Sequence, residues 1–396
     1  MKTWQKIGLA LLVILVIVGI WLYPKYQMLQ YTIHLFDEDK IVENFRTFNK
    51  KWPVSELKAA KQPHQYSQES NMTLPNDFSF KGKTYQIEKF LKDSWTTGFL
   101  VIQDDTIVFE KYFLENTEAT RNISWSVAKS YISALFGIAV EEGYIKNIEQ
   151  KVEEYCPSLK GSGYEGVRIK DVLQMSTGVR FNEDYGDFNS DINRWGRGFA
   201  LGESQDAFAG TLKRELEPGT VNHYVSINTH VLGMILTRAT GRTITDYMQE
   251  KLYDPLGMEF DGYWLIDGKK MEMALGGLNL TLRDFAKIGS LFLHEGNWKG
   301  QQIVSKDWVK ASVTPDAPHV QPTEDDFGYG YQWWIPKGTE GEFMALGVYN
   351  QNIYINPTTK TVIVKLSANP RFNESSYVPS SSMAALEMYR KIAKSF

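Results

Sequence analysis

Two side chains three positions apart could carry covalent catalysis: Ser126 and Lys129, in the segment Ser126-Val-Ala-Lys129. This segment opens a run of apolar residues that predicts a buried helix, and residues i and i+3 of a helix lie on the same face. Serine is a weak nucleophile at neutral pH and needs a neighbouring base. A lysine held away from water can be that base, because desolvation disfavours its charged form.

The same spacing occurs a second time, in Ser55-Glu-Leu-Lys58. A helix cap or a solvated helix face is the ordinary explanation of Ser-x-x-Lys, and Ser55 lies among several charged residues. The helix that begins at Ser126 is too apolar for a surface helix. Only Lys129 is therefore expected to be held out of water.

Signatures of other catalytic machineries are missing from the sequence. It contains no Gly-x-Ser-x-Gly, no His-Glu-x-x-His among its six histidines, and no Walker loop. Cys156 is the only cysteine, which excludes an intramolecular disulfide and cysteine-based zinc patterns. The net charge of -4 provides no bulk positive field for nucleic acid. We therefore expect neither a metal, nor a cofactor, nor a nucleic-acid partner.

A segment rich in acidic and aromatic residues spans 181–191 and includes Asp184, Asp187 and Asp191. It lacks the ligand spacing and the terminal glutamate of an EF-hand. Calcium binding is the minor interpretation, and a loop that faces the substrate is favoured.

The N-terminus predicts a membrane anchor. Residues 7–23 are apolar and uncharged, which is about the lower limit of roughly 17 residues for a transmembrane helix. Lys2 and Lys6 precede the run and place residues 1–6 in the cytoplasm. The sequence Tyr23-Pro24-Lys25-Tyr26 offers no small-residue cleavage site, so an uncleaved anchor is favoured over a signal peptide, with a buried core helix third.

Alternating apolar and turn residues predict the elements that position Ser126. A hairpin around Asp104-Asp105 precedes it, and several helices follow, the first of them ending near Gly143. Strands return over residues 329–366, and a helix over 383–394 closes the chain. Early and late strands are expected to form one antiparallel sheet with the helices as a separate layer, which is an α+β fold.

These motifs, in this order, resemble the serine β-lactamase and penicillin-binding-protein superfamily, on its class C and esterase side. The chain is most similar to the 6-aminohexanoate-dimer hydrolase-like serine hydrolases. The matching features run over about residues 85–396: Ser126-Val-Ala-Lys129, the segment 169–178, Pro218-Gly219 before Tyr224-Val-Ser226, the segment 231–242, Gly276-Gly-Leu-Asn279, and Ala345-Leu-Gly347-Val348. The resemblance implies a β-lactamase/transpeptidase-like fold, with an antiparallel sheet flanked by helices and a mostly helical subdomain.

The resemblance also implies catalytic roles. Ser126 would attack a carbonyl carbon and form an acyl-enzyme, while Lys129 and Tyr224 would share a proton, one of them as general base. A cationic lysine nearby would lower the pKa of the tyrosine. The backbone N–H groups of Ser126 and Val348 would form the oxyanion hole.

Four further residues are expected to bind substrate. Gly347 would let its strand approach the substrate closely, Tyr185 and Ser226 would contact substrate or leaving group, and Asn279 would line the pocket.

Two departures from the family pattern bear on the substrate. The second motif is Tyr-Val-Ser instead of Tyr-x-Asn, and the third is Ala-Leu-Gly instead of Lys-Thr-Gly. The absent lysine would otherwise hold the carboxylate of a β-lactam or a D-Ala peptide. We therefore expect a small-molecule ester or amide without that carboxylate.

The domain prediction is a tail over 1–6, an anchor over 7–23, a spacer and lead-in over 24–84, and a hydrolase domain over 85–396. The protein would be a single-pass protein of the bacterial inner membrane, with its catalytic domain on the periplasmic or extracellular side. Two alternatives remain. One is an anchored sensor that is acylated with little turnover, and the other is a non-catalytic scaffold, which would not need Ser126, Lys129 and Tyr224.

Overall fold

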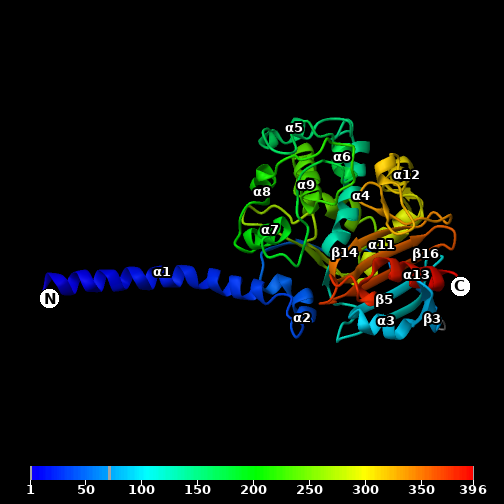
Figure 1. Cartoon of the computed structure of the whole chain (residues 1–396), viewed down its shortest axis with the longest axis horizontal. Coiled ribbons are helices and arrows are strands. Elements are labelled where there is room, and N and C mark those ends of the chain that lie inside the picture. Colours follow the sequence, from blue (N-terminus) through cyan, green and yellow to red (C-terminus); the bar gives the residue numbers. More distant parts are fainter. Residues whose placement is uncertain (1, 70–72, 396) are drawn as a thin grey trace.

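The computed structural model describes residues 2–69 and 73–395. Figure 1 shows a single long helix, α1 (Thr3–Ile33), that leads into a two-part body. One part is a sheet covered by helices, and the other is a helical subdomain built from α4 to α9. This is the predicted α+β architecture, in which a sheet flanked by helices is joined to a mostly helical subdomain.

Over the described residues, the large sheet has eight strands in the order β12-β13-β14-β15-β16-β5-β6-β2. Neighbouring strands are antiparallel, except that β2 runs parallel to β6. The strands are β2 (Ser67–Gln68), β5 (Thr96–Gln103), β6 (Thr106–Tyr112), β12 (Gly328–Tyr329), β13 (Trp334–Ile335), β14 (Phe343–Gly347), β15 (Gln351–Asn356) and β16 (Thr361–Ser367). The expected pairing of early with late strands is confirmed, because β5 pairs with β16.

Alternation along β5 decides which helices cover each face of this sheet. Phe99 and Val101 belong to one core with α3 (Ile87–Asp93) and α13 (Ser382–Ala393). Leu100 and Ile102 belong to the other core with α11 (Leu282–Leu293), since successive side chains of a strand point to opposite faces.

The helical subdomain is organised around α4 (Ala128–Glu141) and α9 (Ser226–Thr240), which pack against each other. Shorter helices surround them: α5 (Val152–Tyr155), α6 (Ile169–Leu173), α7 (Asp191–Ala200), α8 (Gln205–Thr211) and α10 (Ile244–Met248). Gly143 follows α4 with a φ of 77°, a left-handed conformation that suits a helix end. The helix that ends near Gly143 is thereby confirmed.

A smaller sheet connects the N-terminal segment to Ser126. Its order is β1 (Val54–Leu57), β8 (Gly262–Leu265), β9 (Leu278–Leu280) and β7 (Asn122–Ile123), and β7 leads directly to Ser126. Side chains before β1 are buried in the main core, namely Leu35, Ile41, Phe45, Phe48 and Trp52. Ile41 and Phe45 belong to α2 (Ile41–Arg46), and all five residues fall within 24–84. A part of the predicted spacer therefore packs into the body.

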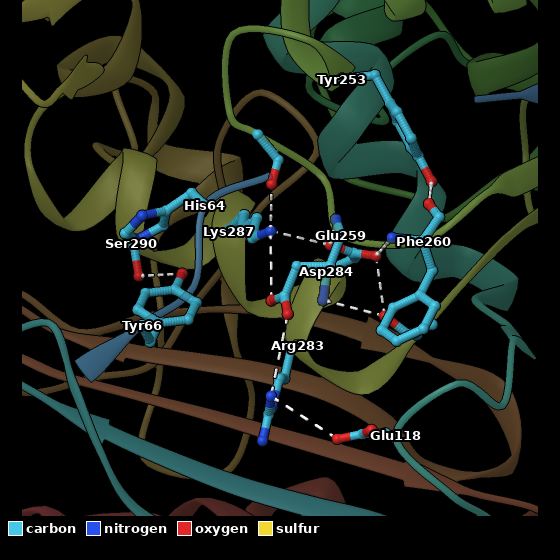
Figure 2. Close-up of polar contacts among 12 residues, drawn as sticks. His64, Tyr66, Glu118, Tyr253, Glu259, Phe260, Arg283, Asp284, Lys287 and Ser290 are labelled. Atoms are coloured by element: carbon cyan, nitrogen blue, oxygen red, sulfur yellow. Dashed lines mark hydrogen bonds and ion pairs between the residues drawn. The ribbon is translucent and has the colours of Figure 1, made fainter. Parts of the chain in front are cut away.

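Charged side chains are buried between α11 and the loop before β8 (Figure 2). The amine of Lys287 donates to Asp284 Oδ1 at 3.0 Å and to the carbonyl oxygen of Gly257 at 2.6 Å. Asp284 also accepts the backbone N–H groups of Glu259 and Phe260. These contacts fix the start of α11 against the loop, because a buried charge is stable only when it is paired.

We expect Lys287→Met to destabilise the protein by about 3–5 kcal/mol, because it leaves the buried Asp284 without its cation. Thermal unfolding followed by tryptophan fluorescence would measure the loss. Lys306→Met is the matched control: Lys306 pairs with Glu295 on the surface, where an ion pair is worth about 1 kcal/mol or less. Equal unfolding temperatures of the two variants would contradict this expectation.

Candidate active site

Ser126 and Lys129 face each other at the start of α4. Ser126 lies in the single turn Trp125–Val127 that precedes the helix, and Lys129 Nζ lies 3.1 Å from Ser126 Oγ. Lys129 is 2% exposed, and its amine also donates to the carbonyl oxygen of Leu275 at 2.6 Å. Burial lowers the pKa of Lys129 to about 7, against an opposite effect of the Glu183 carboxylate. Near neutral pH this amine can therefore be an uncharged base.

Tyr224 lies two residues before the first residue of α9, next to Lys129. Its ring lies 5.4 Å from Lys129 Nζ and stacks on Trp334 at 5.3 Å between centroids. Burial raises the pKa of Tyr224 well above its ordinary value and Glu183 adds to the rise, while hydrogen bonds with Ser126 and Ser226 oppose it. The expectation that a lysine cation lowers this pKa is wrong, because burial dominates and Lys129 itself tends to be neutral.

Glu183 is the member of the site that sequence reasoning did not single out. Its carboxylate accepts the Ser226 hydroxyl at 2.6 Å, the Ser226 N–H at 3.0 Å and the Tyr185 hydroxyl at 2.8 Å. Tyr185 and Ser226, both predicted to contact substrate, are thus brought together by a shared carboxylate. The only available signal was its position in the acidic segment 181–191.

The aspartates of that segment stabilise its own turns. Asp184 accepts the N–H of Gly186 at 2.8 Å, and Asp187 accepts that of Asn189 at 2.9 Å. Asp191 pairs with Arg194 at 2.9 Å. Each of the three carboxylates therefore has a structural partner.

The strand β14 runs along the turn that carries Ser126. A Cβ atom on Gly347 would lie 2.8 Å from the carbonyl oxygen of Ser124 and 3.2 Å from the backbone nitrogen of Ser126. Val348 follows directly, and the chain then turns through left-handed residues, Tyr349 and Asn350, with φ of 61° and 67°. The backbone next to Val348 is thereby held against Ser126.

A second buried amine supports this turn from within the sheet. Lys365 of β16 is 1% exposed, and its Nζ lies 3.4 Å from the carbonyl oxygen of Asn350 and hydrogen bonds to Ser367. Burial lowers the pKa of Lys365 to about 7. Sequence reasoning did not single out Lys365.

We expect Gly347→Ala to lower kcat by about 10²–10³, the effect of losing one oxyanion donor, because the new methyl group must push β14 away from Ser126. Steady-state kinetics with a chromogenic ester would measure this loss. The exposed Gly300 is not a suitable control: nothing lies within 4 Å of a Cβ there, but its φ of 89° is left-handed and would strain any side chain. Nothing lies within 4 Å of a Cβ on Gly196 either, and its φ is not left-handed, so Gly196→Ala is the control. A loss of kcat in Gly196→Ala equal to that in Gly347→Ala would contradict the expectation.

Asn279 was predicted to line the pocket. It is fully buried in β9, paired with Ile123 and Tyr263, and its amide group donates to the carbonyl oxygen of Gly277 at 2.9 Å. The same segment supplies the carbonyl oxygen of Leu275, which accepts a hydrogen bond from Lys129. A separate cavity of about 760 Å³ is lined by residues such as His64, Asp105 and His294, and includes none of Ser126, Lys129 and Tyr224.

Comparison with known proteins adds three results. A family model described as beta-lactamase matches residues 87–378. A 6-aminohexanoate-dimer hydrolase from Paenarthrobacter ureafaciens is 31% identical over 298 residues, which are 72% of this chain and 75% of the relative. The structure of a putative 6-aminohexanoate-dimer hydrolase from Bacillus anthracis aligns with a TM-score of 0.79 at 23% identity, over 91% of this chain and 95% of that one.

A class C beta-lactamase mutant shares the fold at greater distance, with a TM-score of 0.57 and 18% identity over 78% of this chain and 95% of that one.

Proposed function

This chain belongs to the beta-lactamase family of serine hydrolases, and from that premise we propose that it hydrolyses a carboxylic ester or amide through an acyl-enzyme on Ser126. The observation that carries the proposal is the distance of 3.1 Å between Lys129 Nζ and Ser126 Oγ in a site where burial lowers the pKa of the amine to about 7. A base whose pKa lies near the working pH is effective in proton transfer.

The proposed reaction assigns a role to each group. Neutral Lys129 takes the proton of Ser126, whose Oγ attacks the carbonyl carbon, and the oxyanion is held by the N–H groups of Ser126 and Val348. Tyr224, which keeps its proton, donates it to the leaving group and is reprotonated from Lys129. Water then attacks the acyl-enzyme with the same groups acting in reverse, which frees the acid and restores Ser126.

Glu183 would set the electrostatics of this proton transfer. Its negative charge raises the pKa of both Lys129 and Tyr224. Ser226 and Tyr185 orient the carboxylate, so we assign them to positioning as well as to substrate contact. Gly347 provides close approach of β14, and Asn279 hydrogen bonds within the segment that contains Leu275.

The substrate class follows from the third motif. Ala345-Leu-Gly347 contributes no cation, so the site lacks the lysine that would hold a substrate carboxylate. The name of the relative from Paenarthrobacter ureafaciens points to the amide of an amino acid dimer. We extend the proposal to esters and amides that are not held through a carboxylate.

We further propose that α1 is an uncleaved single-pass anchor at residues 7–23, with residues 85–396 as the hydrolase domain beyond the membrane. The helix is long and apolar enough to span a bilayer, and its apolar window has a mean hydropathy of 2.6 and no buried residue. Intact mass of the protein from the membrane fraction would test this, since cleavage would remove the mass of the apolar segment.

The test of the function is intact-mass analysis of the full chain in detergent after brief exposure to a short p-nitrophenyl ester, with nitrophenol release followed in parallel. A transient acyl mass with continued release supports the hydrolase. An acyl mass that persists without release would instead support the anchored sensor. A fluorophosphonate probe that fails to label Ser126 would contradict both.

A further inference from the structure

The catalytic body begins very close to the end of the apolar run. Past Tyr23, α1 continues without interruption to Ile33, and its first side chains that pack on the core are those of Met28 and Tyr31. Residues 24–27 lie between, and four helical residues span about 6 Å. The polar layer on each side of a bilayer is about 5–8 Å thick. With α1 in a membrane, the body therefore rests on the bilayer surface.

The side of the body that meets the bilayer carries α7. This helix contacts α1, and Figure 1 shows it on the side where α1 arrives. Two large apolar side chains that flank α7 are exposed: Phe188 by 67% and Leu201 by 47%. The Arg197 guanidinium lies 4.0 Å from the Phe188 ring centroid. Apolar side chains next to arginines are typical of helices at a lipid headgroup layer.

The segment directly after α1 packs against residues that neighbour Ser126 and Val348 in the chain. Phe36 stacks on Tyr349, with centroids 5.0 Å apart and ring planes 12° apart, and lies 6.0 Å from Trp125. Trp125 precedes the nucleophile Ser126, and Tyr349 follows Val348. Phe36 is 40% exposed, so this aromatic surface reaches solvent next to the anchor.

The aromatic surface continues toward Glu183. The ring of Phe372 lies 4.1 Å from that of Tyr349 and 5.5 Å from that of Tyr185. Tyr185 and the exposed Phe188 belong to one loop, which runs into α7. A single loop thus lines the site at one end and the membrane-facing surface at the other.

We propose that the enzyme takes its substrate from the bilayer surface: an ester or amide carried on an apolar chain, which lies along Phe36 and Phe372, the two rings that pack on the buried Tyr349, while its carbonyl group reaches Ser126. This inference rests on the proposed serine hydrolysis and on the anchor. Phe188 and Leu201 insert into the headgroup layer and hold the aromatic surface at the lipid. An apolar chain then moves from lipid to aromatic side chains without crossing water.

The test uses the full chain reconstituted in phosphatidylcholine vesicles with a minor fraction of phosphatidylglycerol. Hydrolysis of p-nitrophenyl dodecanoate dissolved in the vesicles is compared with that of p-nitrophenyl acetate in the buffer. The variants are Phe188→Asp and Leu201→Asp. The control is Tyr144→Asp, because Tyr144 is 44% exposed beyond the far end of α4, about 20 Å along the helix from Ala128.

We expect each of the two variants to lose about ten-fold in kcat/KM on the dodecanoate, which corresponds to about 1.4 kcal/mol, and to keep its rate on the acetate. The control should keep both rates. Equal losses on both esters, no loss on either, or wild-type protein that cleaves the acetate and not the dodecanoate would overturn the bilayer proposal and leave the hydrolase intact. Wild-type protein that cleaves neither ester and resists fluorophosphonate at Ser126 would overturn both.

Discussion

Ser126→Ala is expected to lower kcat for ester hydrolysis by about 10⁴-fold or more, because no other group can form the acyl-enzyme and only the oxyanion hole and binding remain. The initial rate of nitrophenol release by the purified full chain would measure this loss. The acyl mass seen on wild-type protein should be absent. Residual activity of one part in ten, with the same ester, would contradict the assignment of Ser126 as nucleophile.

Ser55→Ala is the matched control for this loss, since Ser55 and Lys58 have the same spacing as Ser126 and Lys129. Ser55 lies in β1 opposite Trp264, and Lys58 forms surface ion pairs with Glu56 and Asp261. Adjacent positions of a strand point to opposite faces, so this pair is not arranged as on a helix. The variant should retain full activity.

The second large effect is the dependence of kcat/KM on pH. Lys129 must be neutral to take the serine proton, and burial lowers its pKa to about 7. Activity should therefore rise as pH increases through about 7 and then level off, because Tyr224, whose pKa is raised, keeps its proton well into the alkaline range. Lys129→Met should lose about 10²–10⁴-fold, the usual contribution of a general base.

The variant Glu183→Gln tests whether the rise of kcat/KM with pH reports the titration of Lys129. The Glu183 carboxylate stabilises the charged amine, so its removal lowers the pKa of Lys129 and moves the rise of kcat/KM to lower pH. The buried amine of Lys365 also has a pKa of about 7, but burial alone causes its shift, so its titration should not respond to Glu183. An unmoved profile, or a move to higher pH, would contradict Lys129 as the base. Asp184→Asn, next in the chain and exposed, is the control.

Local features of the chain could be predicted from the sequence. A helix repeats every 3.6 residues, so the spacing of Ser126 and Lys129 already places both side chains on one face. The hairpin around Asp104-Asp105 and the helix end near Gly143 are set by residues next to one another in the chain. The order of the motifs indicated the family, and with it the fold.

The tertiary structure decided what depends on distant segments meeting. Glu183 raises the pKa of Lys129 although 54 positions separate them in the chain, and no rule of sequence spacing predicts such a pair. The predicted lowering of the Tyr224 pKa was wrong, because burial against Trp334 and Tyr329 raises this pKa and the Glu183 carboxylate adds to the rise. No motif or periodicity in residues 35–52 predicts their contact with Trp125 and Tyr349. Periodicity determines the face of each element, whereas desolvation and electrostatics depend on what the folded chain brings to that face.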